Sequence, residues 1–183
     1  MLIINKLVAG GRGLAPVLVR RAATLTLDWD TRQKSRFDAQ DSDGRALGIF
    51  LPRGSTVRGG DVLVAEDGSL VRVVAKPQPV LVVRAGAGGS AFDLARAAYH
   101  LGNRHVALEL QPDRLQLEPD HVLADMLRQM QLTASEEIAP FEPESGAYGA
   151  HAGHGAAPTT KAAAHEHGPH CDHGHDHGHG HHH

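Results

Sequence analysis

The sequence predicts an α+β protein made of two small domains and a tail. In residues 1–77, turn signals recur about every ten residues among short apolar runs without helical spacing, which favours an all-β domain. Over residues 78–148, apolar strands alternate with two stretches of helical periodicity. Residues 149–183 contain no Val, Ile, Leu, Met, Phe, Trp or Tyr. They cannot bury enough apolar surface to offset the entropy lost on ordering, so a disordered tail is expected.

Composition excludes several classes of protein. The formal net charge is −3 with histidine neutral, whereas a nucleic-acid-binding domain normally carries a basic face. The single cysteine, Cys171, excludes a disulfide framework. Residues 1–6 have no basic segment ahead of a short apolar run, so no signal peptide is expected. No apolar run approaches the ~20 residues of a membrane span, and a soluble, cytoplasmic protein is therefore expected.

The N-terminal half is predicted to consist of short strands joined by turns. Residues 1–19 are apolar with a glycine-rich break, and they either add a strand or form an extension. Strands are expected where apolar residues alternate or run together, at residues 24–27, 46–51, 61–65 and 70–74. The turn signals between them lie at Asp41–Gly44, Arg53–Gly54, Gly59–Gly60 and Asp67–Gly68.

The C-terminal half begins at Pro77-Gln78-Pro79, where two prolines disfavour both a helix and a sheet interior. The pattern then predicts a strand at 80–84, a helix from Ser90 capped with Asp93, strands at 105–110 and 115–117, a helix with Pro119 in its first turn, and an extended segment at 132–141. The apolar stripe of the second helix comprises Val122, Leu123, Met126, Leu127 and Met130. The order β-α-β-β-α-β is that of a ferredoxin-like domain.

The stretch Tyr99–His105 connects the first of these helices to the next strand. Gly102 is expected to end the helix with a positive φ, a conformation that Asn103 also tolerates. Residues 106–110 then alternate between apolar and other side chains, as in a half-buried strand. His105 would therefore be fixed by packed elements on both sides, which suits a ligand-bearing residue.

A series of short motifs runs through the chain in a defined order and spacing. They are Arg32-Gln33-Lys34-Ser35-Arg36, Asp43-Gly44, Leu51-Pro52-Arg53-Gly54, Arg58-Gly59-Gly60-Asp61, Gly102-Asn103-Arg104-His105, Asp120-His121-Val122-Leu123 with Met126-Leu127, and Pro140-Phe141-Glu142-Pro143-Glu144-Ser145-Gly146-Ala147-Tyr148. Together they resemble the UreE family, the urease accessory proteins that carry nickel. The resemblance covers residues 25–148 and the His-rich tail.

The resemblance implies a homodimer that holds a metal at its interface, between the two copies of His105. One histidine is too few ligands for a metal, and a two-fold axis brings a residue together with its own copy. It further implies that the chain is not an enzyme and that its cargo is Ni²⁺. The partners it implies are the urease apoprotein and the other urease accessory proteins, including a GTPase. Ligand chemistry alone leaves Cu²⁺, Zn²⁺ and Co²⁺ open as ions.

Most of the histidines lie in the tail. Twelve of the 15 are found after residue 150, and neutral imidazole is a good ligand for nickel, copper and zinc. The candidate tail ligands are His151, His154, His165, His167, His170, Cys171, His173, His175, His177, His179, His181, His182 and His183. Such an interrupted repeat is typical of a metal-binding tail, although a purification tag has a similar composition. Because copper binds most such sites more tightly than nickel, the tail is expected to collect metal rather than select nickel.

Two further histidines are candidate auxiliary ligands. His121 lies in the first turn of the second predicted helix, off its apolar stripe, and is either a ligand or part of a solvated face. Some members of the resembled family carry a histidine two positions earlier, where this chain has Pro119, which argues against a His-X-His site. His100 lies on the first helix and is either a surface residue or a peripheral ligand.

Arg32, Lys34 and Arg36 alternate, so in an extended segment they would share one face. Such a row is either a solvated edge that discourages strand pairing or a surface for acidic partners. The second interpretation follows from the family resemblance, which implies that the first domain binds peptides or partner proteins.

These observations predict a nickel metallochaperone that captures Ni²⁺ and delivers it to the urease apoprotein complex. A site with few protein ligands suits a carrier, because an incoming ligand from the recipient can displace it. The alternative is a His-rich storage or detoxification protein, in which removal of the tail would abolish specific binding. A metal-dependent enzyme would instead need His100, His105 and His121 of one chain to converge on one metal, at ~2.0–2.1 Å.

Overall fold

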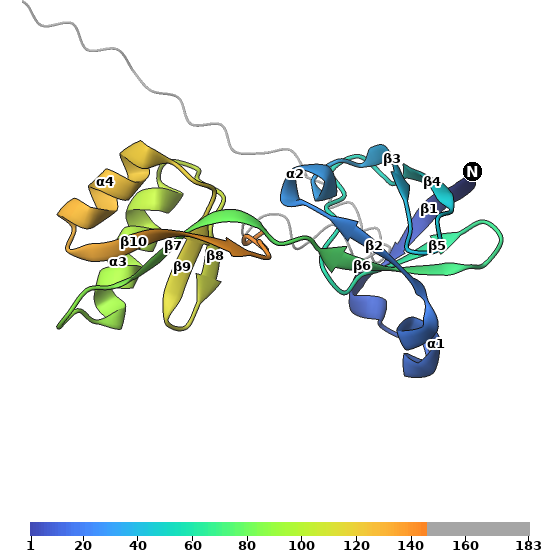
Figure 1. Ribbon diagram of the computed structural model, residues 1–183, viewed down its shortest axis with the longest axis horizontal. Helices are drawn as coiled ribbons and strands as arrows, with labels where there is room; N and C mark the ends of the chain where they lie inside the picture. The colour runs from blue at the N-terminus through green and yellow to red at the C-terminus, as the bar shows by residue number, and fades with distance from the viewer. Residues whose placement is uncertain (146–183) are drawn as a thin grey trace, which may run out of the picture. The chain divides into compact units, whose positions relative to one another are not determined.

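The computed structural model describes residues 1–145, whose strands form one sheet from each half of the chain (Figure 1). The strands of the first sheet are β1 (Leu2–Val8), β2 (Ala23–Leu27), β3 (Arg36–Gln40), β4 (Ala46–Phe50), β5 (Val62–Ala65) and β6 (Leu70–Ala75). Their order is β2-β6-β5-β1-β4-β3. The pairs β1–β4 and β2–β6 are parallel, and the other pairs are antiparallel. The N-terminal half is thus β-rich, as its turn spacing predicts.

The start of the chain supplies an interior strand of this sheet. β1 pairs with β4 through Ile3 and Gly48, and with β5 through Leu7 and Leu63. Within residues 1–75, short helices interrupt the strands: η1 (Ala9–Gly11), α1 (Pro16–Arg21) and α2 (Trp29–Arg32). The prediction of an all-β unit was wrong in this respect, because these helices are too short to show a helical period in the sequence.

The six-stranded sheet has its own apolar core. It comprises Ile4, Leu25, Leu27, Leu47, Ile49, Leu51, Val57, Leu63, Ala65, Val71 and Val73. On β4, Leu47 and Ile49 face this core and Gly48 lies between them, which is the period of two expected of a strand. Burial of this set explains why the short apolar runs of the N-terminal half become strands rather than loops.

The second half of the chain forms a four-stranded antiparallel sheet with two helices. Along residues 78–139 the elements are β7 (Gln78–Ala85), α3 (Ala91–Gly102), β8 (Glu109–Gln111), β9 (Arg114–Leu117), α4 (His121–Gln129) and β10 (Leu132–Ala139). The strand order is β10-β7-β9-β8, so the first and last strands of this half lie side by side. The order of the elements along the chain is therefore β-α-β-β-α-β.

Strand β7 is buried on both faces. Leu81 and Val83 belong to the core that α3 and α4 cover, whereas Val82 packs on the other face with Trp29 and Phe141. A strand buried on both faces needs apolar residues at successive positions. This explains the continuous apolar run that predicted the strand.

Helix α3 begins as predicted and ends later than predicted. The Asp93 carboxylate accepts hydrogen bonds from the Ser90 amide at 2.9 Å and the Ser90 hydroxyl at 3.0 Å, which lower the pKa of Asp93. The prediction that Gly102 ends the helix with a positive φ was wrong, because the helix runs through Gly102 and the Asn103 amide still bonds to the Tyr99 carbonyl. The chain reverses only at the following residues.

Helix α4 is capped by Asp120, whose carboxylate accepts a hydrogen bond from the Leu123 amide at 2.9 Å. Pro119 therefore precedes the helix instead of occupying its first turn. Val122, predicted in the apolar stripe, is 62% exposed because it lies five positions from the buried Leu127, roughly 140° around the helix. None of the helices within residues 1–145 is long and apolar enough to cross a membrane.

The two halves join at Gln78, where β7 begins, so Pro79 lies inside the strand. Pro79 pairs with Ile138 of β10, while β9 on the other side reaches only as far as Leu81. Pro79 therefore has no partner in β9, which is the kind of position in a strand where proline is tolerated. All of the described residues belong to one compact unit.

Candidate metal centre

His105 closes the turn that follows α3. Its amide donates to the Gly102 carbonyl at 2.9 Å, and the amides of Arg104 and Val106 both bond to the Leu101 carbonyl, at 3.0 and 3.3 Å. His105 has a φ of 56°, in the left-handed region that histidine adopts more readily than most residues. Because Leu101 is fully buried while His105 is exposed, the turn is anchored in the core and its imidazole faces outward.

The segment that follows His105 in the sequence is not the strand that the alternation of residues 106–110 predicts. Residues 106–108 lie outside any strand, and β8 begins only at Glu109. The prediction of a strand at 105–110 was wrong over its first four residues because the carbonyl of Leu108 accepts the amide of Glu144, at 2.8 Å, from the segment after β10.

A mainly apolar hollow of about 280 Å³ adjoins this turn. Its lining residues are Ala98, Gly102, Val106, Leu108, Leu110 and Glu144. Leu110 is 49% exposed, and Tyr99 is exposed on the neighbouring helix. His105 therefore lies beside an apolar surface.

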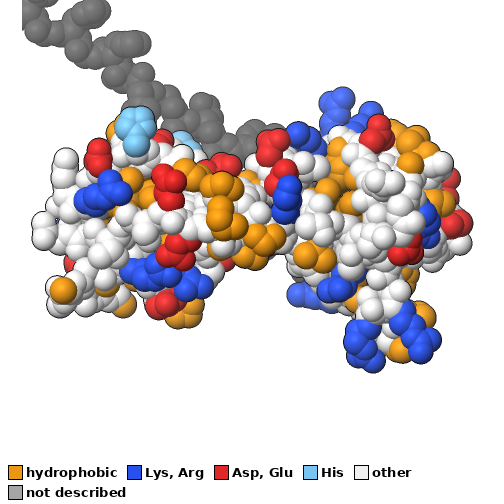
Figure 2. Space-filling model, in the orientation of Figure 1, with side chains coloured by type: hydrophobic (Ala, Val, Ile, Leu, Met, Phe, Trp, Pro, Cys, Tyr) orange, Lys and Arg blue, Asp and Glu red, His pale blue; other side chains and the backbone are white. Residues whose placement is uncertain are grey.

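The other two histidines among residues 1–145 do not join His105 in a three-ligand site. His100 is exposed in the last turn of α3, where its ring meets the Tyr99 ring edge-on with the centroids 5.4 Å apart. His121 is the exposed first residue of α4. Residues 1–145 contain no group of three or more His, Cys, Asp or Glu side chains that could hold a metal ion. Figure 2 shows histidine side chains, in pale blue, on the surface of the half of the chain that contains α3 and α4.

All of the candidate tail ligands lie outside the described residues. They are His151, His154, His165, His167, His170, Cys171, His173, His175, His177, His179, His181, His182 and His183.

Arg32, Lys34 and Arg36 do not share a face. Arg32 is the last residue of α2 and is fully buried, Lys34 lies in the turn after it, and Arg36 opens β3. The prediction of one extended segment was wrong because Asp28 caps a helical turn, accepting the Thr31 amide at 2.9 Å. Hydrogen bonds from Thr31 also hold the pKa of Asp28 below its ordinary value.

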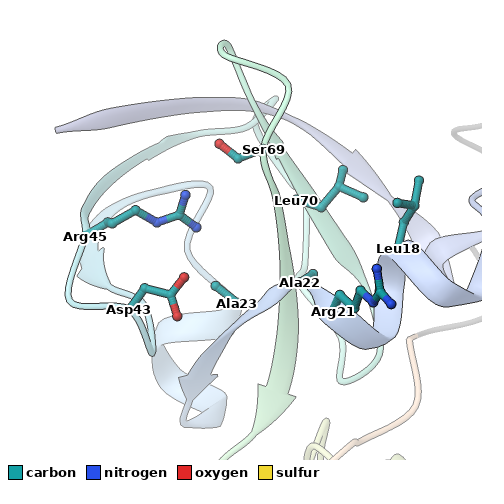
Figure 3. Close-up of a pocket in the computed structure, with 8 residues that line it drawn as sticks. All are labelled: Leu18, Arg21, Ala22, Ala23, Asp43, Arg45, Ser69 and Leu70. Carbon is teal, nitrogen blue, oxygen red and sulfur yellow. The ribbon is translucent and has the colours of Figure 1, made fainter.

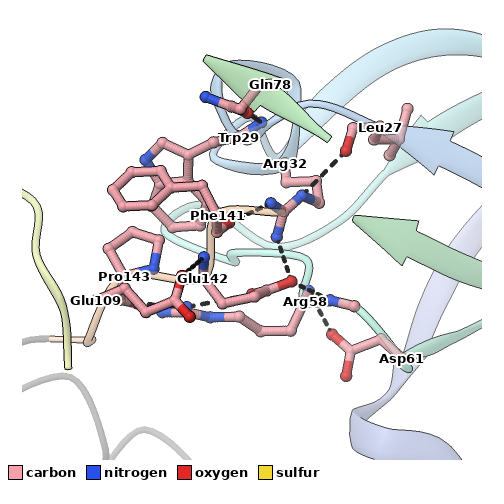
Figure 4. A network of polar contacts seen from close by, with 11 residues as sticks. Leu27, Trp29, Arg32, Arg58, Asp61, Gln78, Glu109, Phe141, Glu142 and Pro143 are labelled. Atoms are coloured by element: carbon pink, nitrogen blue, oxygen red, sulfur yellow. Dashed lines mark hydrogen bonds and ion pairs between the residues drawn. The ribbon is translucent and has the colours of Figure 1, made fainter. Parts of the chain in front are cut away.

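The guanidinium of Arg32 binds the segment after β10 (Figure 4). Its Nη1 lies 2.7 Å from Glu142 Oε1, and its Nη2 donates to the Phe141 carbonyl at 2.5 Å. Its Nε donates to the Leu27 carbonyl at 3.2 Å. The buried charge is therefore paired and hydrogen-bonded in three directions, as a buried ion requires.

Arg58 binds the same segment from a neighbouring loop (Figure 4). Its Nη1 lies 3.5 Å from Glu142 Oε2 and also donates to the Pro143 carbonyl. The guanidinium carbons of Arg58 and Arg32 lie 5.1 and 5.2 Å from the centre of the Trp29 ring, within cation–π range. We call this set of Trp29, Arg32, Arg58 and Glu142 the clasp.

Sequence reasoning missed the clasp. Asp28 followed by Thr31 is a helix-start signal that would have removed Arg32 from the extended segment. Glu142, however, lies 110 positions from Arg32. No local pattern links residues so far apart, so this pairing required the folded chain.

A pocket of about 290 Å³ lies beside α1 (Figure 3). It is lined by Leu18, Arg21, Ala22, Ala23, Asp43, Arg45, Ser69 and Leu70. Arg45 Nη2 is paired with Asp41 Oδ2 at 2.8 Å, and Asp43 lies on the same side of the pocket. Asp41 thus neutralises Arg45, and the remaining charges of the lining, Asp43 and Arg21, are opposite in sign, so we assign the pocket no ligand.

Comparison with known protein families covers both halves of the chain. A family model described as the UreE urease accessory protein, N-terminal domain, matches residues 4–76, and the corresponding C-terminal domain model matches residues 78–183. The chain belongs to the UreE family. UreE proteins are accessory proteins rather than enzymes, and the two-domain UreE architecture accounts for the two sheets.

Individual UreE relatives align along most of the chain. A urease accessory protein UreE of Methylibium petroleiphilum is 78% identical over 156 residues, which cover 85% of this chain and 72% of the relative. One of Polaromonas naphthalenivorans is 67% identical, covering 94% and 88%. One of Albidiferax ferrireducens is 64% identical, covering 96% of this chain and the whole relative.

Proposed function

We propose that this UreE-family chain is a nickel-binding metallochaperone that captures Ni²⁺ and delivers it to the urease apoprotein during assembly of the urease active site. The observation that carries this proposal is the position of His105. It is exposed, held in a left-handed turn anchored on buried Leu101, and adjoins an apolar hollow. An exposed imidazole on a well-anchored turn is suited to binding a metal and to releasing it.

The proposed site is completed by a second copy of the chain. Within residues 1–145 no three-ligand group is formed, whereas a two-fold axis near His105 would supply two imidazoles. Such an interface would bury the apolar surface around Leu110, which favours association of the two copies. His121 and His100 are proposed as auxiliary ligands only, since the three histidines do not form one site within residues 1–145 of a single chain.

The tail, residues 149–183, is proposed to gather metal through the histidines and Cys171 of its sequence. The domains proposed are a partner-binding domain, residues 1–77, and a metal-binding and dimerisation domain, residues 78–148. The strand order β10-β7-β9-β8 supports the assignment of the second domain as ferredoxin-like.

The partners proposed are urease apoprotein and the other urease accessory proteins, including a GTPase, in the cytoplasm. The names of the relatives, which are urease accessory proteins, support this recipient. Lys34 and Arg36 stay candidates for contacts with acidic partners, because Lys34 is exposed and Arg36 lies on the edge strand β3. Arg32 is excluded from this role by its burial.

Nickel titration by calorimetry tests the proposal, using the chain cut after Ala150 beside the same chain with His105→Ala. We expect one Ni²⁺ for two chains and its loss in the variant. A second variant, His105→Gly, fits the left-handed backbone without strain and separates loss of the imidazole from distortion of the turn. Both variants should lose the site.

Storage or detoxification is the competing function. It predicts that the chain cut after Ala150 binds no nickel, or binds it equally well without His105. Either result would overturn the carrier proposal, because only the tail would then hold metal.

A further inference from the structure

The segment after β10 is bound on two sides. On one side the Glu142 carboxylate pairs with Arg32 at 2.7 Å. On the other side the Glu142 amide donates to Glu109 Oε2 at 2.7 Å, and the Glu144 amide donates to the Leu108 carbonyl at 2.8 Å. The segment thus connects the N-terminal half of the chain with residues 108–109.

Residues 108–109 follow His105 closely along the chain. Leu108 is three positions from His105, so their Cα atoms are at most about 11 Å apart. Residues 106–108 belong to no strand, and Glu144 and Val106 line the same hollow. A shift of residues 142–144 would therefore move the chain that carries His105.

The hydrogen bonds of the clasp favour a single position of residues 141–143 relative to Arg32. Apolar contacts alone would let Phe141 and Pro143 shift along the surface that they pack against, since the hydrophobic effect has no direction. Arg32 instead bonds to a carbonyl and a carboxylate of two successive residues, Phe141 and Glu142, and also to Leu27. Because the guanidinium is planar and rigid, it can donate all of these hydrogen bonds only when the segment lies in one position.

We propose that Arg32 and Glu142 are positioning residues for the metal at His105, acting through residues 108–109 without touching the ion. The inference rests on the proposed function, because it requires His105 to be a ligand. Removing the charge of Glu142 would leave the buried Arg32 cation unpaired. The segment would then be held less firmly to the N-terminal half, and residues 108–109, which follow the turn, would lose part of their support.

The test is a double-mutant cycle in the full-length chain. Nickel binding is measured by calorimetry in the wild type, Glu142→Gln, His105→Ala and the double variant, and the binding that His105→Ala removes defines the site apart from the tail. We expect Glu142→Gln to weaken this component roughly ten-fold, as for residues that support metal ligands, and to have no effect on nickel binding once His105 is absent.

Glu137→Gln is the matched control. It makes the same chemical change on β10 but breaks an exposed pair, Arg84 Nη1 to Glu137 Oε1 at 2.7 Å, and it should leave nickel binding unchanged. If Glu142→Gln does not fold, Glu142→Asp keeps the charge but draws it back by one methylene, with the same direction expected.

Two results would overturn the inference. Equal His105-dependent affinity in Glu142→Gln and Glu137→Gln would show that the clasp contributes only stability. No loss of binding in His105→Ala would overturn the proposed function and this inference together, which distinguishes the two failures.

Discussion

The conformation of His105 is set by its place in a turn, not by its chemistry alone. Within residues 1–145, His105 and Gln131 are the non-glycine residues with positive φ, at 56° and 65°, and each lies two or three residues after the end of a helix. A left-handed conformation costs about 1–2 kcal/mol for such residues. Glycine would avoid that cost at position 105, so the imidazole there is consistent with a functional requirement.

Asp41 shows how individual contacts set stability and its pH dependence. Burial raises the pKa of Asp41, but hydrogen bonds from the amides of Arg45 and Asp43 and from the Arg45 side chain outweigh it and leave the pKa below its ordinary value. Because the pKa is lowered in the folded state, the stability this carboxylate contributes is present above pH ~4 and is lost as the pH falls through the lowered value.

We therefore expect Asp41→Asn to lower the free energy of unfolding by about 2 kcal/mol at neutral pH, the typical value for hydrogen bonds to a charged group. The variant should also lose less stability than the wild type as the pH falls below ~4. Urea unfolding at several pH values measures both effects. Asp43→Asn, in the same turn but exposed, should leave stability unchanged, and equal loss in the two variants would refute the role of Asp41.

At the scale of elements, the sequence predicted most strands and helices but placed several ends wrongly. The strand after His105 is shorter than its alternation predicts, because Leu108 bonds to Glu144. Helix α2 was not predicted, since four residues show no period. Ends are set by which neighbour accepts the last hydrogen bonds, and that neighbour is often distant in sequence.

The start of α4 depends on one cap. Asp120→Ala removes the acceptor of the Leu123 amide and should lower the free energy of unfolding by about 1 kcal/mol. Denaturant unfolding is the measurement. Asp125→Ala changes the same residue type within the helix, where Asp125 pairs with Arg128 on the exposed side, and its smaller effect is the comparison. A larger loss in Asp125→Ala would contradict the capping role.

At the scale of the whole molecule, the proposed dimer depends on the apolar surface beside His105. Leu110 lines the hollow with Val106 and is half exposed in the single chain. Leu110→Glu would place an unpaired carboxylate in the interface, which costs several kcal/mol on burial. We expect the dimer to dissociate at least about ten-fold more readily, since about 1.4 kcal/mol corresponds to a factor of ten.

Light scattering during size-exclusion chromatography measures this dissociation, and nickel stoichiometry should fall with it. Val122→Glu is the control, because Val122 is exposed on α4 and does not line the hollow. A Leu110→Glu chain that stays dimeric would place the interface elsewhere.

The sequence by itself determined a β-rich first half and a mixed second half, the start of α3 directly after its cap Ser90, and the turn that contains His105. These features are encoded by residues close together in the chain, through periodicity, caps and turn residues. Only the tertiary structure decided that β1 is an interior strand, that His105 rather than Gly102 is left-handed, and that Arg32 is buried against Glu142. Each of these depends on hydrogen bonds or burial supplied by the folded surroundings, which local pattern cannot reveal.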